Sequence, residues 1–312
     1  MTNKTICSAF WKHTNIRPKN EIYPCCRYKS SVQTFDGNVE NILHSKEYEK
    51  LRRDSANGVE NPNCQKCYND EKLGKKSFRN WFNENYKTDS VNLEYIEIGF
   101  DNICNLSCDG CWEDWSSTWW KIKNSNLPPK QGILDTEDFF NIPKDIEKVV
   151  FLGGEPLMTN RHRIFLSSLE DLSKIDVMYY TNGMFKLTEK DHELLNQCKK
   201  VTFSVSIDGY KDLNEKVRTG SNWNTIVDFI DDCPYDVIIN SVIHRNNWHG
   251  FRELYNWIKN KNLAWKINIL TYPNNLCINN LDKEERLKLI DILKNIDHPD
   301  KDYIQNFLTK SI

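Results

Sequence analysis

Cysteine placement constrains this 312-residue chain more than any other feature of its sequence. Three of the eleven cysteines fall within eight residues, in the pattern Cys104-x3-Cys108-x2-Cys111, directly after the apolar run Tyr95–Phe100. Five more lie nearer the N-terminus, and the last three are isolated. Because no apolar run reaches the roughly 18 residues that span a bilayer and no secretory signal is visible, we expect a cytoplasmic, reducing setting with no membrane partner. Grouped cysteines in that setting indicate metal ligation or catalysis rather than disulfides.

Composition narrows the class of protein further. The chain is 39% hydrophobic and contains 12 glycines and 10 prolines, which excludes collagen, low-complexity and disordered chains. Its net charge of −2 argues against nucleic acid as a partner, since backbone binding requires many cationic contacts.

Short β-rich runs alternate with amphipathic, helix-like stretches from residue 93 onward. The runs are Tyr95–Phe100, Lys148–Leu152, Asp176–Tyr180, Val201–Val205, Asp236–Val242 and Trp265–Leu270. This alternation predicts βα units and a parallel sheet. Six units fall short of the eight in a closed barrel, so we expect an α/β fold with a partial, TIM-like (β/α)6 barrel. Chemistry in such a sheet belongs at the carboxyl ends of the strands.

The polar segment 83–92 predicts a linker between two domains. We expect a small α+β domain over 1–90, and the partial barrel with a C-terminal helical extension over 91–312. Predicted helices cover 38–53, 77–82, 163–174, 251–261 and 283–296. The region 1–90 offers only a small apolar core. A metal cluster would help to order it, because metal binding can supply folding free energy.

The cysteine triplet is suited to a soft metal centre. Thiolates select iron–sulfur clusters, zinc or copper(I). Three ligands rather than four leave one coordination position open, as a catalytic centre requires. Spacing alone also permits a zinc site completed by a distant Cys or His.

A cysteine triplet in this place, on a pattern of six βα units, resembles the radical S-adenosylmethionine (SAM) enzymes. The resemblance implies that Cys104, Cys108 and Cys111 hold a [4Fe–4S] cluster that binds SAM through its fourth iron. It further implies reductive cleavage of SAM to a 5′-deoxyadenosyl radical, which abstracts hydrogen from the substrate. An electron donor such as flavodoxin or ferredoxin is then an expected partner.

The segment Phe151-Leu-Gly-Gly-Glu155-Pro resembles the GGEP motif of that family. The resemblance implies that Gly153 and Gly154 bring the backbone close to SAM, and that Glu155 pairs with the SAM ammonium group. Glycine freedom and carboxylate charge suit both roles. A simple strand-to-helix turn is the alternative.

Six further residues resemble the family's SAM contacts at the ends of later strands: Thr181, Asn182, Ser206, Asp208, Arg218 and Asn240. Among them, Arg218 is implied to bind the SAM carboxylate, which a guanidinium can do bidentately. Each has a structural alternative, namely a turn, a capped strand end or a solvated arginine. One departure is Gly110, which stands where the family commonly has an aromatic residue, and Trp112 is expected to cover the adenine instead.

A second set of cysteines lies near the N-terminus: Cys7, Cys25, Cys64 and Cys67. Four thiolates predict a fully ligated centre, either zinc or iron–sulfur. The set resembles the twitch or SPASM auxiliary domain, although that domain usually follows the barrel and here precedes it. A single CxxC pair implies one auxiliary [4Fe–4S] cluster. Cys25 and Cys26 compete for one ligand position, and we favour Cys25.

Together these motifs predict a radical SAM enzyme of oxidoreductase or transferase type. Members with auxiliary domains often modify ribosomally made peptides, so a peptide or protein substrate is expected. Alternatives with the same chemistry are a dehydrogenase of a small sugar or alcohol, and a nucleotide or tRNA modifier. A zinc-binding interaction protein is the non-enzymatic alternative, and it does not explain the GGEP motif.

Overall fold

The computed structural model of the chain describes residues 5–124, 126, 139 and 141–309, and it divides the chain into two units. Unit 1 combines residues 1–103, 130–178 and 187–201, whereas unit 2 combines residues 104–129, 179–186 and 202–312. The proposed active-site motifs are therefore shared between the units. The GGEP segment belongs to unit 1, and the cysteine triplet belongs to unit 2.

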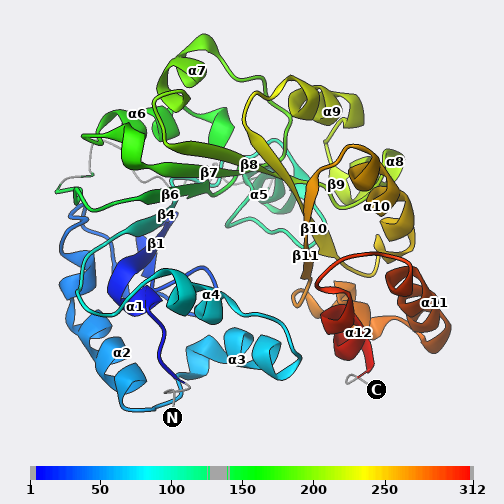
Figure 1. The fold of residues 1–312 in the computed structure, drawn as a ribbon. Coiled ribbons are helices and arrows are strands. Elements are labelled where there is room, and N and C mark those ends of the chain that lie inside the picture. The colour runs from blue at the N-terminus through cyan, green and yellow to red at the C-terminus, as the bar shows by residue number, and fades with distance from the viewer. Residues whose placement is uncertain (1–4, 125, 127–138, 140, 310–312) are drawn as a thin grey trace. The chain divides into compact units, whose positions relative to one another are not determined.

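Unit 1 is built on a mixed sheet around the predicted first strand of the barrel. β4 (Tyr95–Gly99) is buried along its whole length and pairs in parallel with β6 (Lys148–Leu152) and with β1 (His13–Arg17). β2 (Glu21–Tyr23) and β3 (Gln33–Thr34) extend the sheet as antiparallel strands. The N-terminal region thus contributes a strand to the same sheet as β4, which the sequence pattern does not predict (Figure 1).

The helices of unit 1 are α1 (Ala9–Lys12), α2 (Lys46–Ala56), α3 (Gln65–Lys72), α4 (Phe78–Asn85), α6 (Arg161–Ser167) and α7 (Glu189–Leu195). The predicted helix over 38–53 starts later than expected. Ser45 caps α2 by accepting the N–H of Tyr48, and a short 3-10 turn precedes it. Serine favours this capping position because its hydroxyl satisfies an N–H that has no partner inside the helix.

The predicted helix over 163–174 is wrong in its second half. α6 ends at Ser167, and the hydroxyl of Ser168 donates to the carbonyl of Phe165 at 2.7 Å. Asp171 then caps a separate 3-10 turn at Leu172–Lys174. Serine and aspartate side chains compete with the helix for backbone groups, which explains the break.

Unit 2 contains three parallel strands in the order β11-β10-β8. They are β8 (Lys200–Ser206), β10 (Asp236–Ile243) and β11 (Ala264–Ile269). Two strands are divided between the units: the first three residues of β7 (Asp176–Thr181) and the first two of β8 belong to unit 1, and the rest of each belongs to unit 2. The helices of unit 2 are α5 (Ser117–Lys123), α8 (Asp212–Val217), α9 (Trp223–Asp232), α10 (Phe251–Asn260), α11 (Lys283–Lys294) and α12 (Lys301–Thr309).

The order of elements confirms the predicted fold class, an α/β core of alternating parallel strands and helices like that of a partial (β/α)6 barrel. Its six strands are β4, β6, β7, β8, β10 and β11. α11 and α12 follow the last strand as the C-terminal helical extension. The division into domains at residue 90 stays a prediction. In the part of the chain that the structure describes, no helix is long and apolar enough to cross a bilayer.

Candidate active site and auxiliary metal site

A short strand pair in unit 2 holds the middle of the cysteine loop. Cys108 lies in β5 (Ser107–Cys108), which pairs with β9 (Arg218–Thr219) so that Cys108 stands opposite Arg218. The N–H of Asp109 adds a bond to the carbonyl of Val217 at 2.7 Å. Because β9 follows α8 directly, this pairing brings a segment more than 100 residues away in sequence to the cysteine loop.

Hydroxyl groups at the start of α5 fix the backbone of the same loop. Ser117 accepts the N–H of Cys104 at 3.1 Å, and Thr118 donates to the carbonyl of Cys104 at 2.7 Å. The hydroxyl of Ser116 donates to the carbonyl of Leu106 at 2.6 Å. The sequence pattern did not assign this role, although Ser116 in front of a helix was a visible capping signal.

The three thiols of the loop favour metal binding over free thiolates. Burial raises the pKa of Cys108, and burial together with the neighbouring cysteines raises the pKa of Cys111 to about 12. Deprotonating Cys108 and Cys111 therefore requires a cationic centre to compensate their charge. The N–H of Leu106 points at the sulfur of Cys104 at 3.5 Å, and N–H groups that face sulfur are one way in which proteins tune iron–sulfur clusters.

Arg218 and Asp208 form an ion pair beside the cysteine loop. Nη1 of Arg218 lies 2.8 Å from Oδ2 of Asp208, and the other carboxylate oxygen accepts the N–H of Val242 at 2.7 Å. Asp208 thus anchors the end of β8 to β10 and also orients the guanidinium. Nε of Arg218 is buried and has no hydrogen-bond partner among the described residues, so the guanidinium retains a donor for a ligand.

The remaining predicted SAM contacts in unit 2 lie at the ends of β7 and β8 and within β10. The side-chain amide of Asn182 donates to Asn105 of the cysteine loop at 2.8 Å, and the hydroxyl of Thr181 accepts the N–H of Gly183. Ser206 stands opposite Asn240 in the ladder between β8 and β10. Asn182 is therefore brought to the cysteine loop, and Ser206 and Asn240 are brought together.

Packing explains the glycine before the third cysteine. Gly110 has a φ of +75°, and a Cβ there would lie 2.8 Å from the side chain of Leu270. An aromatic residue at this position would therefore collide with the chain after β11. Trp112 forms an edge-to-face pair with Tyr272 instead, with ring centroids 6.2 Å apart.

The GGEP segment in unit 1 packs tightly against the residues that lead into the cysteine loop. The N–H of Gly154 donates to the carbonyl of Asp101 at 3.0 Å, and that of Glu155 donates to the carbonyl of Ile103 at 2.7 Å. A Cβ on Gly153 would lie 2.7 Å from the oxygen of Asp101, and one on Gly154 would collide with the oxygen of Ile103. Only glycine permits this approach. The carboxylate of Glu155 is buried and accepts the N–H of Leu157.

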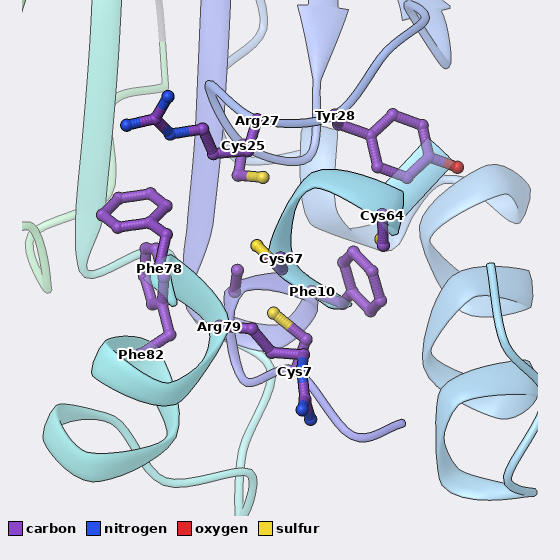
Figure 2. A pocket seen from close by; sticks show the side chains of 11 residues that line it. Cys7, Phe10, Cys25, Arg27, Tyr28, Cys64, Cys67, Phe78, Arg79 and Phe82 are labelled. Atoms are coloured by element: carbon purple, nitrogen blue, oxygen red, sulfur yellow. The ribbon is translucent and has the colours of Figure 1, made fainter. Parts of the chain in front are cut away.

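The four predicted auxiliary cysteines line one pocket in unit 1. Figure 2 shows the sulfur atoms of Cys7, Cys25 and Cys67 pointing into it, with Cys64 beside them. Cys25 is buried in this pocket, whereas the neighbouring Cys26 is exposed. The wall of the pocket also includes Phe10, Arg27, Tyr28, Phe78, Arg79 and Phe82.

Burial also affects the thiols of the auxiliary pocket. Burial raises the pKa of all four auxiliary thiols, that of Cys64 to about 12, so they too need a cationic centre. Across the described ranges, no three His, Cys, Asp or Glu side chains converge closely enough to hold one metal ion.

Strand register places the auxiliary pocket and the GGEP segment at opposite ends of the unit 1 sheet. Tyr23 of β2 pairs with Asn15 of β1, so the chain reaches the level of His13, the amino end of β1, at Cys25. That end is level with Tyr95, the first residue of β4. The GGEP segment follows the carboxyl end of β6. From Tyr95 to Gly99, β4 spans roughly 13 Å.

Two family models match this chain. A model described as the radical SAM superfamily matches residues 98–258, which is more than half of the chain. The chain belongs to the radical SAM superfamily. A second model, described as an iron–sulfur cluster-binding domain and named SPASM, matches residues 7–68. The predicted family and its auxiliary domain are thus confirmed.

Individual relatives of this radical SAM protein are distant. A GTP 3′,8-cyclase of Aliarcobacter butzleri is 27% identical over 144 residues, which are 41% of this chain and 42% of the relative. The chain spans about half the length or less of the curated relatives it matches. Among solved structures, anSMEcpe with bound AdoMet and the Kp18Cys peptide has a TM-score of 0.43 at 17% identity, covering 70% of this chain and 62% of that one. SuiB of Streptococcus suis bound to SAM has a TM-score of 0.47 at 15% identity, covering 85% and 54%.

Family membership confirms the predicted cofactors of this radical SAM protein. The radical SAM domain implies a [4Fe–4S] cluster and SAM, and the SPASM domain implies auxiliary iron–sulfur binding. The thiols and the buried guanidinium described above fit these groups. Which individual residues bind them stays a prediction.

Proposed function

We propose that this protein reductively cleaves SAM at a cluster held by Cys104, Cys108 and Cys111 and modifies a peptide or protein. The observation that carries the proposal is the bond between the N–H of Glu155 and the carbonyl of Ile103. It lays the GGEP segment against the residue that directly precedes Cys104 in the chain. The electron that breaks the sulfonium bond is the chemistry that the cluster supplies when bound.

The residues of the chain bind and orient SAM in this proposal. Glu155, with its buried carboxylate, takes the ammonium group, and Arg218 takes the carboxylate through its remaining donors. Asp208 acts mainly through Arg218, because Arg218 and Val242 already use both of its carboxylate oxygens. Gly153 and Gly154 let the turn that carries Glu155 lie close against residues 101–103, and we propose that they also bring its backbone close to SAM. Thr181, Asn182, Ser206 and Asn240 complete the set of SAM contacts.

The auxiliary pocket is proposed to hold a second [4Fe–4S] cluster through Cys7, Cys25, Cys64 and Cys67. Its place at the amino end of the unit 1 sheet, opposite the GGEP segment, supports a role in electron transfer or in ordering residues 1–90 rather than in gripping SAM. A flavodoxin or ferredoxin is the proposed electron donor. Residues 1–90 and 91–312 are the proposed domains.

A peptide or protein substrate is supported by the SPASM match over residues 7–68, because auxiliary domains of this kind often accompany peptide-modifying radical enzymes. The similarity to GTP 3′,8-cyclases favours a second candidate, a nucleotide substrate. If the substrate is a peptide, a peptide should increase SAM cleavage and change in mass. If the substrate is a nucleotide, a nucleotide should do both.

Anaerobically reconstituted, dithionite-reduced protein should be incubated with SAM and with either a mixture of cell-derived peptides or GTP. The proposal predicts more 5′-deoxyadenosine with peptides, together with a peptide whose mass has changed. Stimulation by GTP alone, with a changed nucleotide, would establish the second candidate instead. Zinc without iron or acid-labile sulfide in anaerobically purified protein would remove both.

A further inference from the structure

The ion pair between Arg161 and Asp101 joins the two segments that meet at the GGEP turn. Arg161 is the first residue of α6, the helix that follows this turn, and Asp101 lies between β4 and Ile103. Nη1 of Arg161 is 2.9 Å from Oδ2 of Asp101, and the other carboxylate oxygen accepts the N–H of Ile103 at 2.9 Å. We propose that this ion pair positions Glu155 for the SAM ammonium group, an inference that rests on the proposed function.

Burial makes this ion pair sensitive to the loss of either partner. The side chain of Asp101 is 6% exposed and that of Arg161 is 19% exposed. Burial raises the pKa of the Asp101 carboxyl, and Arg161 opposes that shift by favouring the ionised form. Removal of the guanidinium would leave the Asp101 carboxyl group buried without its charged partner. The surrounding chain would have to move to give that group water or another hydrogen-bond donor.

The chain from Glu155 to Arg161 is attached to the residues before Cys104 at both ends. At one end, the backbone N–H groups of Gly154 and Glu155 bind the carbonyls of Asp101 and Ile103. At the other end, the Arg161 side chain binds Asp101. The carboxylate of Glu155 caps the turn between these attachments, so its direction depends on both. Loss of the second attachment should let the carboxylate shift.

The ligand pair that tests this inference is SAM and 5′-methylthioadenosine, which lacks the amino-acid group. Binding of each to the holoenzyme should be measured by equilibrium dialysis. Asp101→Asn and Arg161→Gln should each weaken SAM binding about tenfold, as loss of a group that orients a ligand contact typically does. Arg161→Lys should restore most of the affinity. Binding of 5′-methylthioadenosine should not change in any variant.

A matched control is available on the same helix. Arg163→Gln breaks an ion pair of the same length, 2.9 Å from Nη1 of Arg163 to Oδ1 of Asp191, which does not involve the GGEP turn. It should lower stability without changing either affinity. Equal losses for both ligands, or unchanged SAM binding in Asp101→Asn, would overturn the positioning role.

Glu155→Gln separates this inference from the proposed function. If it weakens SAM binding while Asp101→Asn does not, only the positioning role fails. If neither variant weakens SAM binding, the proposed role of Glu155 fails as well.

Discussion

Arg218 and Asp208 form a buried ion pair, 2.8 Å between nitrogen and oxygen, at the strand pair that carries Cys108. Burial alone would lower the pKa of the guanidinium, but the nearby Cys108 and Asp208 together outweigh it and raise that pKa. A permanent positive charge is thus fixed beside the proposed cluster ligands. The same group still has a buried Nε with no hydrogen-bond partner among the described residues.

Asp208→Asn should therefore damage both stability and SAM binding. Removing one member of a buried ion pair leaves the other charge buried without a partner, so we expect a loss of about 3 kcal/mol in the free energy of unfolding. Urea unfolding under anaerobic conditions measures the loss, and equilibrium dialysis measures SAM affinity. Arg252→Gln, which removes an exposed pair to Asp291, should cost under about 0.5 kcal/mol and leave affinity unchanged. Equal effects of the two variants would refute the special role of Arg218 and Asp208.

Gly154→Ala should disrupt the contact between the GGEP segment and Ile103. The added Cβ collides with a backbone carbonyl, which cannot move without breaking the bond from Glu155. We expect a loss of about 2 kcal/mol or more in stability, together with weaker SAM binding. Gly58→Ala is the comparison, because the site is open although its φ is +81°. It should cost about 1 kcal/mol and spare SAM binding. SAM affinity that survives Gly154→Ala would show that the close approach is dispensable.

Cys25→Ser and Cys26→Ser should have different iron contents. Cys25 is buried in the auxiliary pocket and Cys26 is exposed outside it. Reconstituted protein should contain about eight irons per chain as two four-iron clusters, and Cys25→Ser should approach about four. Cys26→Ser should keep the wild-type content in iron and acid-labile sulfide assays. The reverse result would mean that Cys26 is the ligand.

Acid should destabilise the fold through buried histidines. Burial lowers the pKa of His13, His162 and His244, that of His162 to about 4. Unfolding returns each to its usual value near 6.5, so the unfolded state binds more protons between the two values. The free energy of unfolding should thus be constant above about pH 7 and fall as the pH drops from about 6.5.

The variant His162→Gln isolates this effect. Its free energy of unfolding should fall less steeply than that of wild type between about pH 7 and about pH 5, as measured by urea titration. His249→Gln removes an exposed histidine and should keep the wild-type slope. An unchanged slope in His162→Gln would show that this histidine is not buried in its neutral form.

The barrel strands could be predicted from sequence because their pattern is local. Each of the six apolar runs becomes a strand whose ends differ from the expectation by one residue or less. β1 escaped prediction because its sequence, His-Thr-Asn-Ile-Arg, looks polar. Its Asn15 is satisfied by Glu97 of β4 at 2.7 Å, a contact between residues 82 positions apart that no local pattern reveals.

In the candidate site, too, local motifs could be predicted from the sequence and contacts between distant residues could not. The cysteines and the GGEP motif are visible because each is contiguous. The hydroxyl contacts to Cys104 and the ion pair between Arg161 and Asp101 could not be predicted from the sequence. The residues that form them are ordinary polar residues, and their partners lie far away in the chain. Asp208 was expected to contact SAM, and its partnership with Arg218 became apparent only when β8 and β9 were seen in space.

The central claim is that the triplet Cys104, Cys108 and Cys111 supports SAM cleavage. The most direct measurement is the amount of 5′-deoxyadenosine formed from SAM by dithionite-reduced, fully reconstituted protein. We expect steady formation by wild type and none by the variant in which all three cysteines are alanine, although that variant keeps its auxiliary iron. Wild-type protein with both clusters intact that forms no 5′-deoxyadenosine would contradict it.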